Sequence, residues 1–185
     1  MSSTLRAFAT LLLLSACATP GTPAAGASPP VETVAARPED VGSVEGVLRA
    51  FYEVTNIAPG APRQWARDRT LYVPWIRFVA LGSGATGPKV TVWTHDQFVA
   101  ASDPLFEKGF VEREIHRVTR RYGNMVHVDS TYETLTGTDA PVRGRGVNSL
   151  DLYFDGQRWW VASVVWQSED AAHPIPPELL PPAGG

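Results

Sequence analysis

The second half of the chain contains two long runs of strand-forming residues that only two residues separate. These runs are residues 110–122 and 125–135, and Gly123-Asn124 between them suits the two-residue turn of a β-hairpin. A second pair of runs follows at residues 144–154 and 159–167, again with an Asp-Gly turn signal between them. Strands joined by such short turns pair antiparallel. The sequence therefore predicts an antiparallel sheet as the main element of the fold.

The first half of the chain contains patterns that are typical of helices. Apolar residues recur at helical spacing over residues 44–54, which predicts a helix with one apolar face. Asp40 or Ser43 is available as its N-terminal cap. A second helix is predicted over residues 62–71, where Pro62 lies near the first helical position and Trp65 on the buried side.

Two short strands and a third helix are predicted between these helices and the long strands. Residues 76–81 and 89–94 are the strands, and the glycine-rich residues 82–88 join them in a hairpin. Thr94 and Gln97 are three residues apart and match a capping box, which predicts a short helix after the second strand.

Polar side chains collect on one predicted face of the hairpin formed by residues 110–135. Pairing outward from the turn places His116 opposite Thr131 and Glu114 opposite Glu133, and residues two apart share a face. The polar face then carries Glu112, Glu114, His116, Arg120, His127, Asp129, Thr131 and Glu133. If this face lines a pocket, it predicts general acid–base chemistry, with His127, Glu114 and His116 as catalytic candidates. If it faces solvent, its charges are those of an ordinary outer sheet face.

The N-terminus has the features of a secretion signal over residues 1–16. Arg6 supplies a positive charge, residues 7–14 are apolar, and Ser15 and Ala16 are small. The sequence LSAC at 14–17 resembles the bacterial lipobox, which makes Cys17 the predicted site of lipid attachment. Cys17 is also the only cysteine, so no intramolecular disulfide can form. The alternative is an ordinary signal in which this cysteine is incidental.

Composition divides the remaining chain into three parts. Residues 17–40 are rich in proline and alanine and are expected to tether a folded domain at residues 41–170, and residues 171–185 form a proline-rich tail. In lipoprotein signals, aspartate after the cysteine favours inner-membrane retention. Ala18 therefore predicts the outer membrane of a bacterial envelope, with the domain facing the periplasm. The formal net charge of −3 argues against nucleic acid as a partner.

The order of predicted elements resembles the nuclear transport factor 2-like superfamily, including its SnoaL-like members. The segments that carry the resemblance are 46–52 (GVLRAFY), 65–74, 110–115 (FVEREI), 123–133, 145–150 (RGVNSL) and 155–160 (DGQRWW). The resemblance implies an α+β fold in which a curved antiparallel sheet of about six strands packs against three N-terminal helices to form a cone. Some members of the superfamily are isomerases, dehydratases or cyclases, and others only bind or dimerise, so the fold leaves the function open.

A cone of this kind is expected to have a pocket at its open end. Tyr52, Trp75, His127, Asn148 and Trp166 are the predicted ligand-binding residues, because they combine apolar area with a few polar groups. The leading hypothesis is an envelope lipoprotein that binds a small apolar ligand or a protein partner. The alternatives are a small isomerase or dehydratase that uses a His/carboxylate pair, and a module that forms a homodimer through its sheet.

No cofactor or metal is predicted. The chain has no phosphate-binding loop, nucleophile motif or cofactor fingerprint. Its histidines and acids lack the spacing of a zinc site, and the one cysteine is assigned to lipid attachment.

The lipobox generates a direct prediction. Cys17→Ser removes the thiol that forms the thioether with diacylglycerol, so the variant should not be lipidated and should leave the membrane fraction or accumulate as the precursor. Mass spectrometry and fractionation of the native protein would measure this. An unmodified Cys17 in the mature native protein would contradict the prediction.

Overall fold

The computed structural model describes residues 31, 33–135 and 140–182. Residues 1–16, Cys17 and most of the predicted tether lie outside the described residues. Within the described ranges, no helix is long and apolar enough to cross a membrane.

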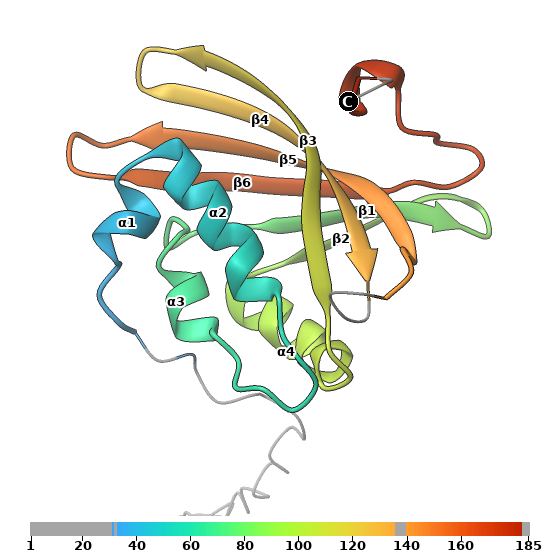
Figure 1. The fold of residues 1–185 in the computed structure, drawn as a ribbon, viewed down its shortest axis with the longest axis horizontal. Helices are drawn as coiled ribbons and strands as arrows, with labels where there is room; N and C mark the ends of the chain where they lie inside the picture. The colour runs from blue at the N-terminus through green and yellow to red at the C-terminus, as the bar shows by residue number, and fades with distance from the viewer. Residues whose placement is uncertain (1–30, 32, 136–139, 183–185) are drawn as a thin grey trace, which may run out of the picture.

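One six-stranded sheet forms the body of the fold. Its strands are β1 Phe78–Gly84, β2 Gly87–Trp93, β3 Val111–Tyr122, β4 Met125–Leu135, β5 Gly144–Phe154 and β6 Trp159–Ser168. They lie in the order β2-β1-β6-β5-β4-β3, and every neighbouring pair is antiparallel except β1 with β6. The sheet curves around the helices without closing (Figure 1). This confirms the predicted α+β cone.

Four helices fill the inside of the curve. They are α1 Pro38–Val41, α2 Val44–Thr55, α3 Trp65–Arg69 and α4 His95–Phe106. The Ser43 hydroxyl accepts the backbone N–H of Gly46 at 3.0 Å, which makes Ser43 the cap of α2. The capping box of Thr94 and Gln97 is present at the start of α4, as predicted.

Two predicted elements have different bounds in the structure. The helix predicted over residues 62–71 is only Trp65–Arg69, because the backbone of the following residues bonds to β6 instead. The N–H of Val161 donates to Leu71 at 2.9 Å, and the N–H of Val73 donates back to Val161 at 3.1 Å. The predicted loop 82–88 is mostly strand, since β1 and β2 continue into it and pair until Gly84 meets Gly87.

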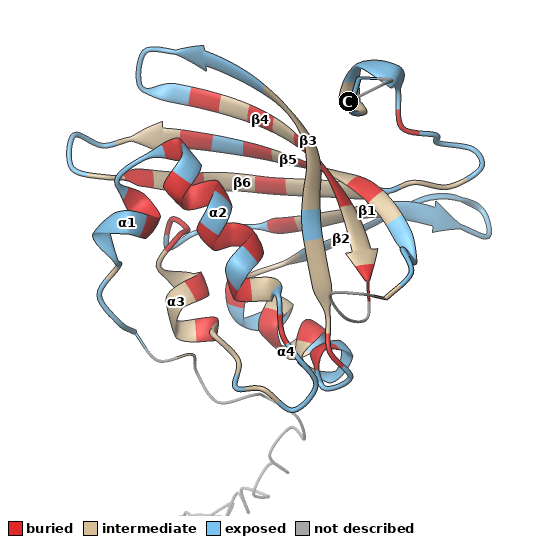
Figure 2. Ribbon diagram, viewed as in Figure 1, coloured by how far each residue is buried: buried red, intermediate tan, exposed pale blue. Residues whose placement is uncertain are grey.

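The core lies between α2 and the inner face of the sheet. Val47, Leu48 and Val54 on α2 are fully buried, and Val128 and Leu150 meet them from the middle strands. Buried positions alternate along β4 and β5, as Figure 2 shows. The inner face is therefore the one that carries the even-numbered residues from 126 to 132.

The β3–β4 hairpin follows the predicted register only near its turn. Gly123 adopts the positive φ of 56° that the turn requires, and Tyr122 pairs with Met125. His116 faces Thr131 as predicted, but Glu114 faces Tyr132. The shift occurs at Ile115, where β3 has one more residue than β4, which is a β-bulge.

This bulge divides the predicted polar face between the two sides of the sheet. Glu112 pairs with Thr134 and Glu114 with Tyr132, so both carboxylates lie on the inner face. Beyond the bulge, His116 pairs with Thr131 on the opposite side. The prediction of one continuous polar face was therefore wrong, and so was the pairing of Glu114 with Glu133, because Arg113 takes that place.

The chain after β6 crosses the outer face of β3 and β4. The Ser83 hydroxyl donates to Asp170 at 2.7 Å, and Ile175 is buried. A short 3₁₀ helix, Pro177–Leu179, follows, and the carbonyl of Leu179 accepts the hydroxyl of Thr131 on β4. This segment explains why Thr131 is fully buried although it points away from the core.

Candidate functional site

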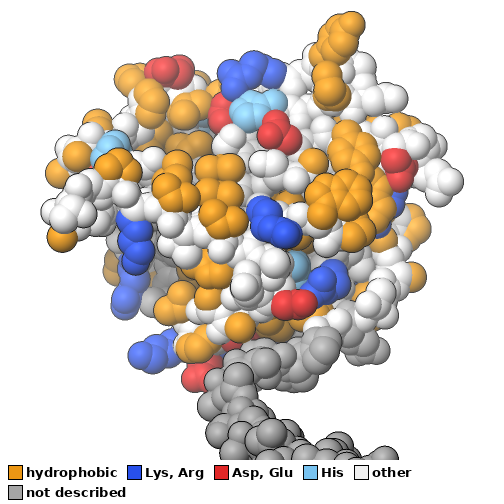
Figure 3. Space-filling view, turned by 180° about the vertical axis from the view of Figure 1, so that it is seen from behind, with side chains coloured by type: hydrophobic (Ala, Val, Ile, Leu, Met, Phe, Trp, Pro, Cys, Tyr) orange, Lys and Arg blue, Asp and Glu red, His pale blue; other side chains and the backbone are white. Residues whose placement is uncertain are grey.

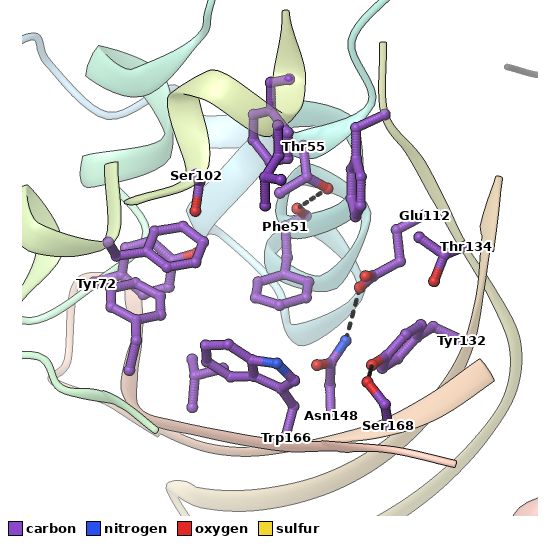
Figure 4. Close-up of a pocket in the computed structure, with 16 residues that line it drawn as sticks. Phe51, Thr55, Tyr72, Ser102, Glu112, Tyr132, Thr134, Asn148, Trp166 and Ser168 are labelled. Carbon is purple, nitrogen blue, oxygen red and sulfur yellow. Dashed lines mark hydrogen bonds between the residues drawn. The ribbon is translucent and has the colours of Figure 1, made fainter. Parts of the chain in front are cut away.

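A cavity of about 330 Å³ lies between α2, α4 and the inner face of the sheet (Figure 4). Most of its wall is apolar, from Phe51, Tyr72, Phe78, Phe98, Leu105, Phe106, Phe110, Val164 and Trp166. Its polar lining residues are Thr55, Ser102, Glu112, Tyr132, Thr134, Asn148 and Ser168. The cavity therefore combines a large aromatic surface with a few groups that can orient a ligand.

Glu112 supplies the only carboxyl group among the described lining residues of this cavity. Its carboxylate oxygen Oε1 accepts a hydrogen bond from Asn148 Nδ2 at 2.9 Å, as Figure 4 shows. The backbone N–H of Glu112 donates to Asn56 Oδ1 at 2.7 Å, which ties the start of β3 to the end of α2. The carboxyl group is thus held from the strand and from the neighbouring helix.

Burial raises the pKa of Glu112 from its ordinary value of 4.5 to about 7, and the hydrogen bond from Asn148 opposes this rise. The direction follows from the surroundings, since an aromatic cavity solvates a carboxylate poorly. A carboxyl group with a pKa near neutrality can both give and take a proton at physiological pH. This makes Glu112 the described residue best suited to acid–base chemistry.

A chain of hydrogen bonds behind the cavity fixes the Asn148 side chain. Its Nδ2 donates a second bond to the Tyr52 hydroxyl at 3.4 Å, and that hydroxyl lies 2.6 Å from Ser130 Oγ. Ser130 donates in turn to Glu114, which also binds Arg117. Because each donor has an acceptor, the amide of Asn148 cannot rotate without breaking bonds, and its NH₂ group stays directed at Glu112.

Two tyrosines line the cavity, and the hydroxyl group of each already has a hydrogen-bond partner. Tyr132 lies 3.5 Å from the hydroxyl of Ser168, and burial raises the pKa of Tyr132 to about 12. The Tyr72 hydroxyl donates to Asp68 at 3.0 Å. Both tyrosines therefore remain protonated at neutral pH, and Tyr132 is the one whose hydroxyl has the weaker bond and can turn toward a ligand.

Three of the predicted ligand-binding residues lie at or next to the cavity. Asn148 and the half-buried Trp166 line it. Tyr52 is buried one layer further in and reaches the site through its bond to Asn148. Trp75 does not contribute, because it lies in the turn before β1 with 66% of its surface exposed.

The histidines predicted as catalytic candidates lie outside the cavity. His127 is on the outer face, with Nδ1 2.9 Å from Asp151 and Nε2 3.2 Å from Asp129. His116 lies on the same face, because beyond the bulge in β3 it pairs with Thr131, and Arg120, four residues further along β3, pairs with His127. Glu114 faces inward, but it pairs with Arg117 and does not line the cavity. A His/carboxylate pair inside the cone is thus contradicted for His127 and His116.

Sequence reasoning placed Glu112 on the polar face without selecting it. Glu112 is directed into the cavity by the register at the start of β3. This register depends on the bulge at Ile115, which no residue type in the sequence marks. Among the residues that the structure describes, no group of three or more His, Cys, Asp or Glu side chains could hold a metal ion.

The raised pKa of Glu112 predicts how stability varies with pH. Between pH 4.5 and about 7 the unfolded chain loses this proton while the folded protein keeps it, so the free energy of unfolding falls as pH rises. The full change corresponds to about 3 kcal/mol. Glu112→Gln keeps an acceptor for Asn148 and does not titrate. The free energy of unfolding of this variant, relative to that of the unmodified protein, should therefore rise by about 3 kcal/mol between pH 4 and pH 8.

Denaturant unfolding at several pH values measures this difference. Glu107→Gln, the same substitution at an exposed position after α4, is the control and should follow the unmodified protein. Parallel pH profiles for Glu112→Gln and the unmodified protein would contradict the assignment.

Comparison with known proteins shows a likeness in fold only. No family model matches the chain, and no curated protein matches it. Solved structures do match. A protein of unknown function with a cystatin-like fold from Nostoc punctiforme has a TM-score of 0.54 and 8% identity over 69% of this chain and 90% of its own.

Two further structures have the same arrangement. An NTF2-like protein of unknown function from Silicibacter pomeroyi has a TM-score of 0.51 and 9% identity over 69% of this chain and 94% of its own. A candidate dehydratase of the NTF2-like family from Streptomyces avermitilis has a TM-score of 0.51 and 14% identity over 71% and 97%. The described chain therefore has the NTF2-like cone fold.

Proposed function

We propose that the cavity binds a small, mostly apolar molecule whose single polar group is held by Glu112 and Asn148. The observation that carries this proposal is the pair itself: a carboxyl and an amide, 2.9 Å apart, in a wall that is otherwise largely aromatic. A volume of about 330 Å³ suits a small ligand. Tyr132 and Ser168 offer hydroxyl groups beside the pair for a second polar contact.

The outer face of the sheet favours a binding module over a module that dimerises through this face. A dimer of that kind needs a large continuous apolar surface. Instead, Arg120, His127 and Asp129 form charged contacts on the outer face, and residues 175–179 cover part of it. The view from behind has hydrophobic side chains interrupted by charged ones (Figure 3). A homodimer and the absence of nucleic-acid partners stay predictions from the sequence.

We further propose that a lipid on Cys17 holds the domain at the membrane. The apolar run followed by LSAC at residues 14–17 supports this, and Ala18 supports the outer membrane, with the domain facing the periplasm. The proline-rich residues that follow would act as an extended linker that holds the domain away from the membrane surface.

Proton transfer on the bound molecule is the second candidate function, and the pKa of Glu112 favours it. A carboxylate with a pKa of about 7 can remove a proton from carbon. Returning the proton to another carbon is the chemistry of an isomerase, and giving it to a hydroxyl group that leaves as water is the chemistry of a dehydratase. The likeness in fold to the Streptomyces avermitilis protein is compatible with this candidate and does not decide between binding and catalysis.

Binding is tested with 2-naphthol and naphthalene, which differ by one hydroxyl group. Naphthol should bind about tenfold more tightly, because a hydrogen bond to a charged group contributes about 1.5–3 kcal/mol. Ser102→Phe places a ring in the cavity and should weaken binding at least about tenfold. Ala101→Phe adds the same ring to the exposed side of α4 and is the matched control. Unchanged affinity in Ser102→Phe would refute the site.

Catalysis is tested with the ketone 2-tetralone in D₂O. Glu112 would remove a proton from the carbon beside the carbonyl, and the enolate would then take up a deuteron, which NMR detects. Glu112→Gln should lower the catalysed rate at least about 100-fold, while Ala101→Phe keeps it. The rate should rise with pH through about 7 as Glu112 loses its proton. An equal rate in Glu112→Gln would leave ligand binding as the function.

A further inference from the structure

A second cavity, of about 340 Å³, lies outside the cone beside α3. Tyr72 contributes to the walls of both cavities. The segment before α1 closes one side of the second cavity with Val34 and Ala36, and Arg158 and Trp160 at the start of β6 form another side. Its wall therefore comes from parts of the chain that do not contribute to the site of Glu112.

The cationic side chains that line this second cavity are two arginines, Arg69 and Arg158, and none of its described lining residues is Asp or Glu. Arg69 also forms an ion pair with the exposed Asp96. Arg158 lies over the ring of Trp160 at 3.7 Å and donates to the carbonyl oxygens of Thr70 and Trp159. Arg158 forms no ion pair with a described residue, so its charge is available to a ligand.

Two buried nitrogen atoms in this wall have no hydrogen-bond partner among the described residues. They are Nε of Arg69 and Nδ1 of His95. The His95 side chain is only 3% exposed, and its other nitrogen, Nε2, lies 2.7 Å from Asp68. Leaving a buried polar group unpaired is costly, and native structures do so rarely. Arg69 Nε is a donor that lacks an acceptor beside this cavity, whereas His95 Nδ1 is itself an acceptor when Nε2–H donates to Asp68.

We propose that the second cavity binds a small organic anion, with its oxyanion group between Arg158 and Arg69. Guanidinium groups hold carboxylates and phosphates through paired charge-assisted hydrogen bonds. The apolar part of the ligand would lie against Trp160, Pro74 and Ile76, which line the same cavity. This site is independent of the proposed ligand of Glu112 and takes an anionic ligand, which the carboxylate of Glu112 would repel.

Calorimetric titration of the full chain tests the proposal with benzoate, phenyl phosphate and the neutral analogue benzamide. Benzoate or phenyl phosphate should bind at least about tenfold more tightly than benzamide, and the stronger of the two identifies the oxyanion. Arg158→Gln and Arg69→Gln should each weaken that binding by about tenfold. Two arginine variants are used because Arg158→Gln also removes the bond to the carbonyl of Thr70, a structural contact that Arg69→Gln leaves intact.

Two controls separate this cavity from other sites. Arg113→Gln removes an exposed arginine on β3 and should leave the affinity unchanged. Glu112→Gln should also leave it unchanged, whereas an anion bound in the first cavity would bind more tightly once the carboxylate is removed. Equal binding of benzamide, no binding of either anion, unchanged affinity in both Arg158→Gln and Arg69→Gln, or a marked change in Glu112→Gln would each overturn the proposal.

Discussion

One extra residue in β3, Ile115, decides which polar side chains reach the inside of the cone. Side chains alternate along a strand, so a single inserted residue exchanges the two faces for everything beyond it. Before the bulge, Glu112 points at the cavity; after it, His116 points outward. The partner strand has no bulge against β3, and His127 therefore stays on the outer face. Without Ile115, one of two changes would follow. If the pairing next to the turn stayed fixed, Glu112 would move to the outer face, and if Glu112 stayed inside, the pairing next to the turn would shift by one residue.

The carboxyl group that the bulge directs inward is destabilising in its ionised form, and the surrounding structure limits this cost. Asn148 donates to Glu112, and Tyr52 and Ser130 hold Asn148 in place. These bonds favour the carboxylate, but burial outweighs them, since the pKa still rises to about 7. A group retained at such a cost more often serves a ligand than the fold, because an apolar residue of similar size would stabilise the same position.

Local patterns predicted most of the fold, and the parts they missed depend on long-range contacts. The cap at Ser43, the capping box at Thr94 and the Gly123 turn are set by neighbours within a few residues, so the sequence predicts them correctly. The early end of α3 depends on pairing with Val161, about 90 residues away. The bulge at Ile115 likewise follows from how both ends of β3 are held, and no local residue pattern encodes it.

Tyr72, which lines both cavities, is held between them by a hydrogen bond to the buried Asp68. Asp68 accepts the Tyr72 hydroxyl through Oδ1 and lies 2.7 Å from His95 through Oδ2, so both oxygens of this buried carboxylate are engaged. Tyr72 therefore cannot swing aside to join the cavities without leaving Oδ1 of this buried carboxylate without a donor. On one side of Tyr72 the ligand meets a carboxyl group, and on the other it meets guanidinium groups. An anion that satisfies the second site would be repelled by the Glu112 carboxylate of the first, so the two proposed sites would select chemically distinct ligands.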